Sequence, residues 1–116
     1  MKRVAVDALP DGPLAAAGVF HQHWLPHVEA LLQAGDDVMV GLAPADHTHR
    51  EWRRAVAAGL ARAHTPRRVN VVAGKAAVLD AFATYLAEAP GVTGQYLEGD
   101  GDGAGDPAAD LAGHRA

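Results

Sequence analysis

Histidine and acidic side chains are the residues of this 116-residue sequence that are best suited to chemistry. His47 directly follows Asp46, and His49 lies two residues further on. His23 and His27 are four residues apart, which places them on one face of a helix. Such groups could bind zinc or nickel, and a histidine oriented by an aspartate could act as a general base. However, the sequence has neither serine nor cysteine to serve as a nucleophile. Solvated histidines are the simpler interpretation, so we expect no metal, no cofactor and no catalytic residue; His47, His49 and His23 are the candidates if a metal site exists.

The elements that would position these residues follow from apolar periodicity. Short apolar runs, typical of strands, alternate with longer helical patterns. Pro26 should split the first helix near Leu25, and Gly35 should end it. The expected strands cover residues 4–6, 38–42, 69–72 and 95–97, and the expected helices cover residues 14–34, 48–64 and 76–89. This order predicts an α/β sandwich with three helices and a sheet of about four parallel strands.

The arrangement of the helices follows from the handedness of the connections. If the strands lie in chain order, right-handed crossovers place all three helices on one face of the sheet. The other face would then have to be covered by a second protein or a second copy, unless the strand order differs, because parallel sheets are normally covered on both sides. We expect one α/β domain over residues 1–98 and a disordered tail rich in Gly, Asp and Ala over residues 99–116.

Composition narrows the classes of function. The formal net charge is -4, and the basic residues are scattered, so nucleic acid is not an expected partner. No apolar stretch is long enough to span a bilayer, and the start of the sequence has no signal-peptide pattern, so no membrane association is expected. The absence of cysteine fits a reducing compartment, and we expect a cytoplasmic protein.

Several polar residues have structural interpretations. Asp46 or Thr48 can cap the second helix, with Glu51 completing a capping box. Asn70 should satisfy backbone groups beside its strand. The arginines should form a solvated face, with phosphate binding as the alternative; they are Arg53, Arg54, Arg67 and Arg68.

The order of the segments resembles the C-terminal half of the short-chain dehydrogenase/reductase (SDR) family. The matching segments read WLPHVEALLQAG, DDVMVGLAP, HREWRRAVAAGLARAHTP, RRVNVVAG, AVLDAFATYLAEAPG and VTGQYLEGDG. The resemblance extends from about residue 4 to residue 101, and RVNVVAG and GVTGQYLEGDG are its most specific parts. It implies a truncated, Rossmann-like α/β fold with three helices and about four parallel strands, which is half of a doubly wound fold.

The same comparison implies a loss of chemistry. The family binds its dinucleotide on a Gly-rich turn after a strand, and no such turn follows a strand here. Where the family has its catalytic Ser, Tyr and Lys, this sequence has Ala43, Asp46 and Arg50. The resemblance therefore implies a pseudoenzyme rather than an enzyme. The alternative is a small-molecule or metal-binding enzyme that uses the Asp46–Arg50 cluster.

The resemblance also implies assembly. In the family, the helices that match residues 14–34 and 49–64 pack against the same pair of helices from another subunit. We therefore expect protein–protein interaction, either as a homo-oligomer or with a full-length SDR-like subunit. The expected interface residues are Phe20, Trp24, Val28, Trp52, Val56 and Leu60.

Overall fold

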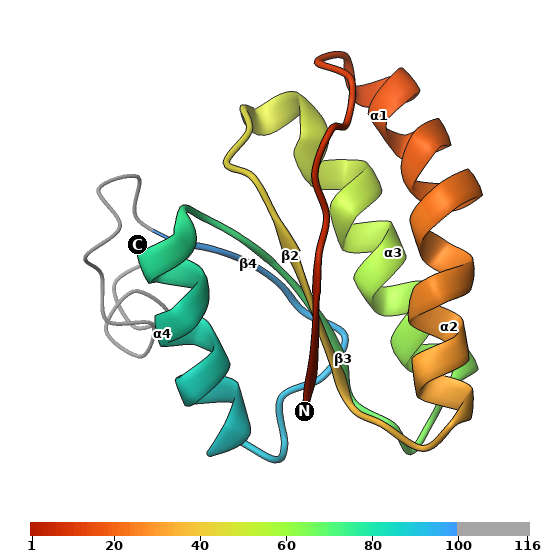
Figure 1. Cartoon of the computed structure of the whole chain (residues 1–116), viewed down its shortest axis with the longest axis vertical. Helices are drawn as coiled ribbons and strands as arrows, with labels where there is room; N and C mark the ends of the chain where they lie inside the picture. Colours follow the sequence, from red (N-terminus) through yellow and green to blue (C-terminus); the bar gives the residue numbers. More distant parts are fainter. Residues whose placement is uncertain (100–116) are drawn as a thin grey trace.

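A computed structural model describes residues 1–99 of the chain, and the expected tail from residue 100 onward lies outside the described residues. Four strands alternate with helical segments along the chain (Figure 1). The strands are β1 (Lys2–Ala5), β2 (Val38–Leu42), β3 (Val69–Ala73) and β4 (Tyr96–Glu98). The helices are α1 (Pro13–Val19), α2 (Leu25–Gln33), α3 (Arg50–Ala63) and α4 (Ala76–Ala87), with a π-helical turn at Phe20–Trp24 and a 3-10 turn at His47–His49.

The sheet is parallel throughout, and its strand order is β1-β2-β3-β4. Every residue of β2 and β3 is buried, which explains why these two segments are apolar without polar alternation. The expected α/β class and Rossmann-like parallel sheet are therefore confirmed.

The first helix is interrupted as Pro26 predicts. Pro26 has no N–H to donate to the carbonyl four residues earlier, so a regular α-helix cannot pass through this position unchanged. The chain instead forms the π-helical turn Phe20–Trp24, after which the Leu25 N–H donates to the Phe20 carbonyl and α2 begins. Gly35 follows α2 with φ +99°, a left-handed conformation that glycine adopts without strain.

The expectation that all helices lie on one face of the sheet is wrong. The helices α1, α2 and α3 cover one face, whereas α4 covers the other (Figure 1). Alternate side chains of β2 show the division: Val38 and Val40 pack in the first core, and Met39 packs in the second core with Phe82 of α4. The crossover from β3 to β4 therefore has the opposite hand to the two crossovers before it. It buries an apolar surface that one-sided helices would have left open.

Close contact between glycine and a side chain allows α4 to pack tightly on this face. An ideal Cβ on Gly74, at the end of β3, would lie 2.5 Å from Val78 Cγ1. A Cβ on Gly99, just after β4, would lie 2.0 Å from the same atom. Any larger residue at either position would push the first turn of α4 away from the ends of the strands.

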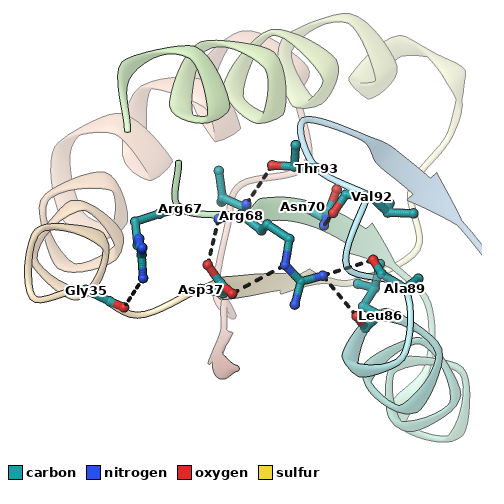
Figure 2. A network of polar contacts seen from close by, with 10 residues as sticks. Gly35, Asp37, Arg67, Arg68, Asn70, Leu86, Ala89, Val92 and Thr93 are labelled. Atoms are coloured by element: carbon teal, nitrogen blue, oxygen red, sulfur yellow. Dashed lines mark hydrogen bonds and ion pairs between the residues drawn. The ribbon is translucent and has the colours of Figure 1, made fainter. Parts of the chain in front are cut away.

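The RVN segment, residues 68–70, has a structural role at the end of the sheet where β3 begins (Figure 2). Arg68 donates from Nη1 to the carbonyls of Leu86 and Ala89 at 3.1 and 3.0 Å, and so it satisfies carbonyl groups around the end of α4. The Arg68 backbone N–H also donates to Asp37 Oδ1 at 2.7 Å. This hydrogen bond, followed by the charge of Arg68, lowers the pKa of Asp37 against the opposing effect of burial.

Asn70 ties the loop between α4 and β4 to the sheet, as its expected role predicted. Its Nδ2 donates to the Val92 carbonyl at 3.0 Å, and its Oδ1 accepts from the Gln95 N–H at 3.1 Å. The side chain is fully buried, so both hydrogen bonds are needed to offset the loss of water.

Candidate functional site

A cavity of about 410 Å³ lies at the edge of the sheet where β1 and β2 end. It is lined by the segments 6–11 and 43–46, which follow these two strands, together with Ala16, His49 and Arg53. Both segments lie at the same end of the molecule as the start of α1 (Figure 1). Carboxyl ends of parallel strands are where α/β proteins place their ligands. The cavity is therefore the natural candidate for a binding site.

Asp46 and Arg50 both lie at this edge, but each has a local partner. The Asp46 carboxylate accepts from the backbone N–H of Thr48 at 2.9 Å and also from the Thr48 hydroxyl. These hydrogen bonds, the hydroxyl first, lower the pKa of Asp46. Asp46, rather than Thr48, is thus the residue that caps the turn before α3. Arg50 donates from Nε to both carboxylate oxygens of Glu98, at 3.0 and 3.3 Å.

His49 is a structural residue. It is 6% exposed, its Nδ1 accepts from Trp52 Nε1 at 3.1 Å, and its Nε2 lies 2.9 Å from the Asp11 carbonyl. Because an indole N–H can only donate, Nδ1 must carry the lone pair and Nε2 the proton. Both ring nitrogens are therefore engaged, and His49 has no nitrogen left for a metal. It fastens the loop after β1 to α3.

The other histidines do not complete a metal site. His47 and His23 are exposed, and His23 lies near His27 and Trp24 on the surface of the first helix. Among residues 1–99, no three His, Cys, Asp or Glu side chains come together as a metal-binding group. The three metal candidates, His47, His49 and His23, therefore belong to no such group in the described part of the chain.

Arg53 departs most from the sequence-based expectation, because it was expected on a solvated face and is only 3% exposed. Its Nη1 donates to the Ala43 carbonyl at 3.0 Å and to the Tyr96 hydroxyl at 3.1 Å. The guanidinium carbon also lies 5.5 Å from the centre of the Trp52 ring, within range of a cation–π interaction. The buried Nε has no hydrogen-bond partner among residues 1–99.

Arg53 is connected to a carboxylate only indirectly, through the hydroxyl group of Tyr96. The Tyr96 hydroxyl, which accepts from Arg53, donates to Glu98 Oε2 at 3.0 Å. Burial raises the pKa of Tyr96, and the hydrogen bond from Arg53 acts against that rise. Glu98 is also the partner of Arg50, so this network holds two guanidinium groups and a single carboxylate. Among residues 1–99, no carboxylate forms an ion pair with Arg53.

The burial of Arg53 has a signal in the sequence that solvent-face reasoning overlooked. Arg53 precedes Val56, Ala57 and Leu60 by three, four and seven residues, which is the spacing of one helical face. All three of these residues are buried in the core. The same periodicity that identified the helix therefore places Arg53 on its inner side.

Four of the six expected interface residues lie inside the chain itself. Phe20, Val28, Val56 and Leu60 belong to the core of the chain itself, with at most 6% of each residue exposed. They face the sheet, because the apolar stripe of each helix must first bury the strands. Trp24 and Trp52 are half-buried at the margin of this core.

The outer side of the helical layer has a different character. A groove of about 180 Å³ runs between α2 and α3, and small residues of α3 line it. Ala55, Gly59 and Ala63 are spaced four residues apart and share the outward face. An added Cβ on Gly59 would meet nothing within 4 Å. This side of α3 is open to close approach by another helix.

The chain belongs to the SDR-like family. It matches the family described as "Short chain dehydrogenase-like protein" over residues 4–99, which includes every strand and helix of the structure apart from the first two residues of β1. Comparison with curated proteins gives no match, and comparison with solved structures gives none. The resemblance inferred from the RVN and TGQ segments is thus confirmed. No helix within residues 1–99 has the length and apolar character needed to cross a membrane.

Proposed function

We propose that this chain is a non-catalytic SDR-like protein that acts by assembling through α2 and α3, with a second copy of itself as the partner. The absence of catalysis is supported by the residues at the three positions that match the family's catalytic Ser, Tyr and Lys. Ala43 has no reactive group, and Asp46 and Arg50 are held by Thr48 and Glu98. An ionised carboxylate beside an ion-paired arginine cannot replace a phenol and an amine that exchange a proton near neutral pH.

The outward face of α3 supports assembly with a second copy. Glu51, Ala55, Gly59 and Arg62 lie on it, with an acidic residue at the start of the helix and a basic residue in its last turn. In an antiparallel pair related by a twofold axis, the start of one α3 faces the end of the other. Glu51 would then approach Arg62 of the second copy, while the small residues allow the helices to come close.

Solution mass is the direct test. We expect sedimentation equilibrium at 100 µM, a concentration on the order of that at which weak dimers form, to give twice the 12.0 kDa chain mass. Gly59→Gln should give a folded single chain, because the added side chain enters open space in the subunit but blocks the groove. Ala87→Gln, at an exposed position of α4 on the other face, is the control and should keep the double mass.

Charge exchange makes the test specific to the antiparallel arrangement. Glu51→Arg and Arg62→Glu should each weaken the dimer, because each places like charges opposite one another. The double exchange should restore it. A single-chain mass for the unaltered protein, or a dimer that ignores all of these changes, would overturn the assembly proposal.

Nucleotide titration addresses the absence of catalysis separately. We expect NADH and NADPH to leave the melting temperature unchanged, since a ligand that binds the folded chain must raise it. A rise of several degrees, or reduction of a carbonyl substrate by the purified chain, would instead favour the enzyme that uses the Asp46–Arg50 cluster. A chelator should likewise leave the melting temperature unchanged.

A further inference from the structure

We propose that the cavity at the ends of β1 and β2 binds a small zwitterionic amino acid with an aliphatic side chain, whose carboxylate is received by Arg53. This inference does not depend on the proposed assembly, because the cavity lies at the edge of the sheet and the groove lies on the outer side of α2 and α3. Binding there also requires no catalytic group.

The unused edge of Arg53 indicates a carboxylate. A guanidinium group has five N–H donors in a planar fork. Nη1 already donates to Ala43 and Tyr96, whereas the buried Nε has no hydrogen-bond partner among residues 1–99. Nε and Nη2 form the side of the group that a carboxylate engages with two parallel hydrogen bonds. A buried cation whose Nε has no partner is poorly explained by structure alone, because buried charges are normally paired.

Acidic groups around the cavity indicate that the ligand also carries a positive charge. Asp7, Asp11 and Asp46 contribute to the lining and are exposed, whereas Arg53 is the buried charged member. Three carboxylates would repel a simple anion such as phosphate or acetate. An ammonium group close to the ligand carboxylate would complement them, and α-amino acids carry these two charges side by side.

The rest of the lining indicates an apolar side chain. Val6, Leu9, Pro10, Ala16 and Pro44 contribute apolar surface. The volume of about 410 Å³ falls near the lower end of the range for small-molecule sites. A ligand the size of leucine or methionine suits this space, whereas a dinucleotide is too large for it.

Three ligands of the same carbon skeleton test the proposal on the unaltered protein. Leucine has both charged groups, 4-methylpentanoate lacks the ammonium group, and 3-methylbutylamine lacks the carboxylate. Amide chemical shifts followed by NMR during titration should show leucine binding at the cavity residues, with each analogue weaker by about tenfold or more, since each loses one set of charge-assisted hydrogen bonds. Absence of leucine binding at millimolar concentration, or equal binding of all three compounds, would overturn the proposal.

Two variants locate the charges within the site. Arg53→Met should abolish leucine binding while its circular dichroism spectrum stays that of the folded protein. Asp7→Asn alters an exposed position and does not touch the core, so it should weaken leucine but leave 4-methylpentanoate unchanged or slightly tighter. Glu88→Gln removes the same charge from the end of α4, outside the cavity, and is the control. Leucine binding that survives in a folded Arg53→Met would contradict the assigned site. If Arg53→Met fails to fold, Asp7→Asn decides alone, and unchanged leucine affinity in that variant would contradict the site as well.

Discussion

Replacing Gly99 by alanine should destabilise the protein, mainly through one contact with Val78. The added Cβ would lie 2.0 Å from Val78 Cγ1, 3.1 Å from Phe82 Cε2 and 3.3 Å from Val78 Cβ. The first distance is far inside van der Waals contact, and Val78 has little freedom to rotate, because a β-branched side chain in a helix strongly prefers one rotamer. Overpacking of this kind costs about 1–3 kcal/mol of unfolding free energy. The φ angle of Gly99 is not in the left-handed region, so the cost is steric.

A double-mutant cycle with Val78→Ala isolates that contact. Val78→Ala removes two buried methyl groups and should cost about 1.6 kcal/mol by itself, at roughly 0.8 kcal/mol for each group. It also removes Cγ1, after which the nearest neighbours of the new Cβ lie at 3.1 and 3.3 Å. The double variant should therefore be about as stable as Val78→Ala alone. The resulting coupling should be about 1–3 kcal/mol.

Urea unfolding followed by the fluorescence of the two tryptophans measures these free energies at one protein concentration. Gly18→Ala is the matched control, because an added Cβ there meets nothing within 4 Å in a helical segment. It should raise the unfolding free energy by about 0.5–1 kcal/mol. If Gly99→Ala were as stable as the unaltered chain, or if its cost simply added to that of Val78→Ala, α4 would not pack against the ends of β3 and β4 as described.

Three further changes test other parts of the structure. Because the pKa of Asp37 is lowered from 3.8, its ionised form stabilises the fold above that value, and the stability is lost as the pH falls through the folded-state pKa. The deficit of Asp37→Asn in urea unfolding should therefore be present at pH 7 and shrink below about pH 4; a constant deficit would contradict the pairing with Arg68. Asn70→Asp loses its donor to the loop before β4 and buries a charge, so it should cost about 2–4 kcal/mol at pH 7 and less at pH 4; equal costs at both values would count against this account. Trp52→Phe removes the N–H that holds His49 and should cost about 1 kcal/mol in thermal unfolding, with no change taken as disagreement.

Local patterns in the sequence were sufficient for most of the elements. The apolar run 38–42 is β2 at the same bounds, and the helical patterns gave α3 and α4 to within two residues at each end. Pro26 and Gly35 act where their backbone chemistry predicts, because a missing N–H and a left-handed φ are properties of single residues. Family segments such as RVN correspond to contacts that fix the loop after α4.

The placement of α4 could not be read from the same patterns. A strand buried on both faces shows no alternation, so neither Met39 nor Val72 revealed which helix would cover it. The handedness rule predicts α4 on the same face as the other helices. The structure places it on the opposite face, where Gly74 and Gly99 leave room for Val78. Contacts between residues distant in sequence decide such a choice, and no local period records them.

The candidate site was only partly accessible to sequence reasoning. The family pattern identifies Asp46 and Arg50 but not their partners. Asp46 is bonded to Thr48, two residues away, whereas Arg50 is bonded to Glu98, 48 residues away. The charge of Arg53 predicts exposure, whereas its position in the helical register predicts the burial that the structure shows. A charged residue on the buried face of a helix must pair with another group, extend its charged end to water, or bind a ligand.

Buried polar groups differ between the two ends of the sheet, one where the strands begin and one where they end. This difference indicates where a functional site lies. At the edge where β3 begins, Asp37, Arg68 and Asn70 all have hydrogen-bond partners within the chain (Figure 2). At the edge where β2 ends, Arg53 keeps a buried nitrogen without an acceptor among residues 1–99 and borders a cavity. Selection for stability alone would favour pairing or replacing such a group, because an unsatisfied buried donor costs about 1–3 kcal/mol. Since the chain satisfies its polar groups elsewhere in the sheet, the exception at Arg53 is better explained by a ligand that completes it than by loose packing.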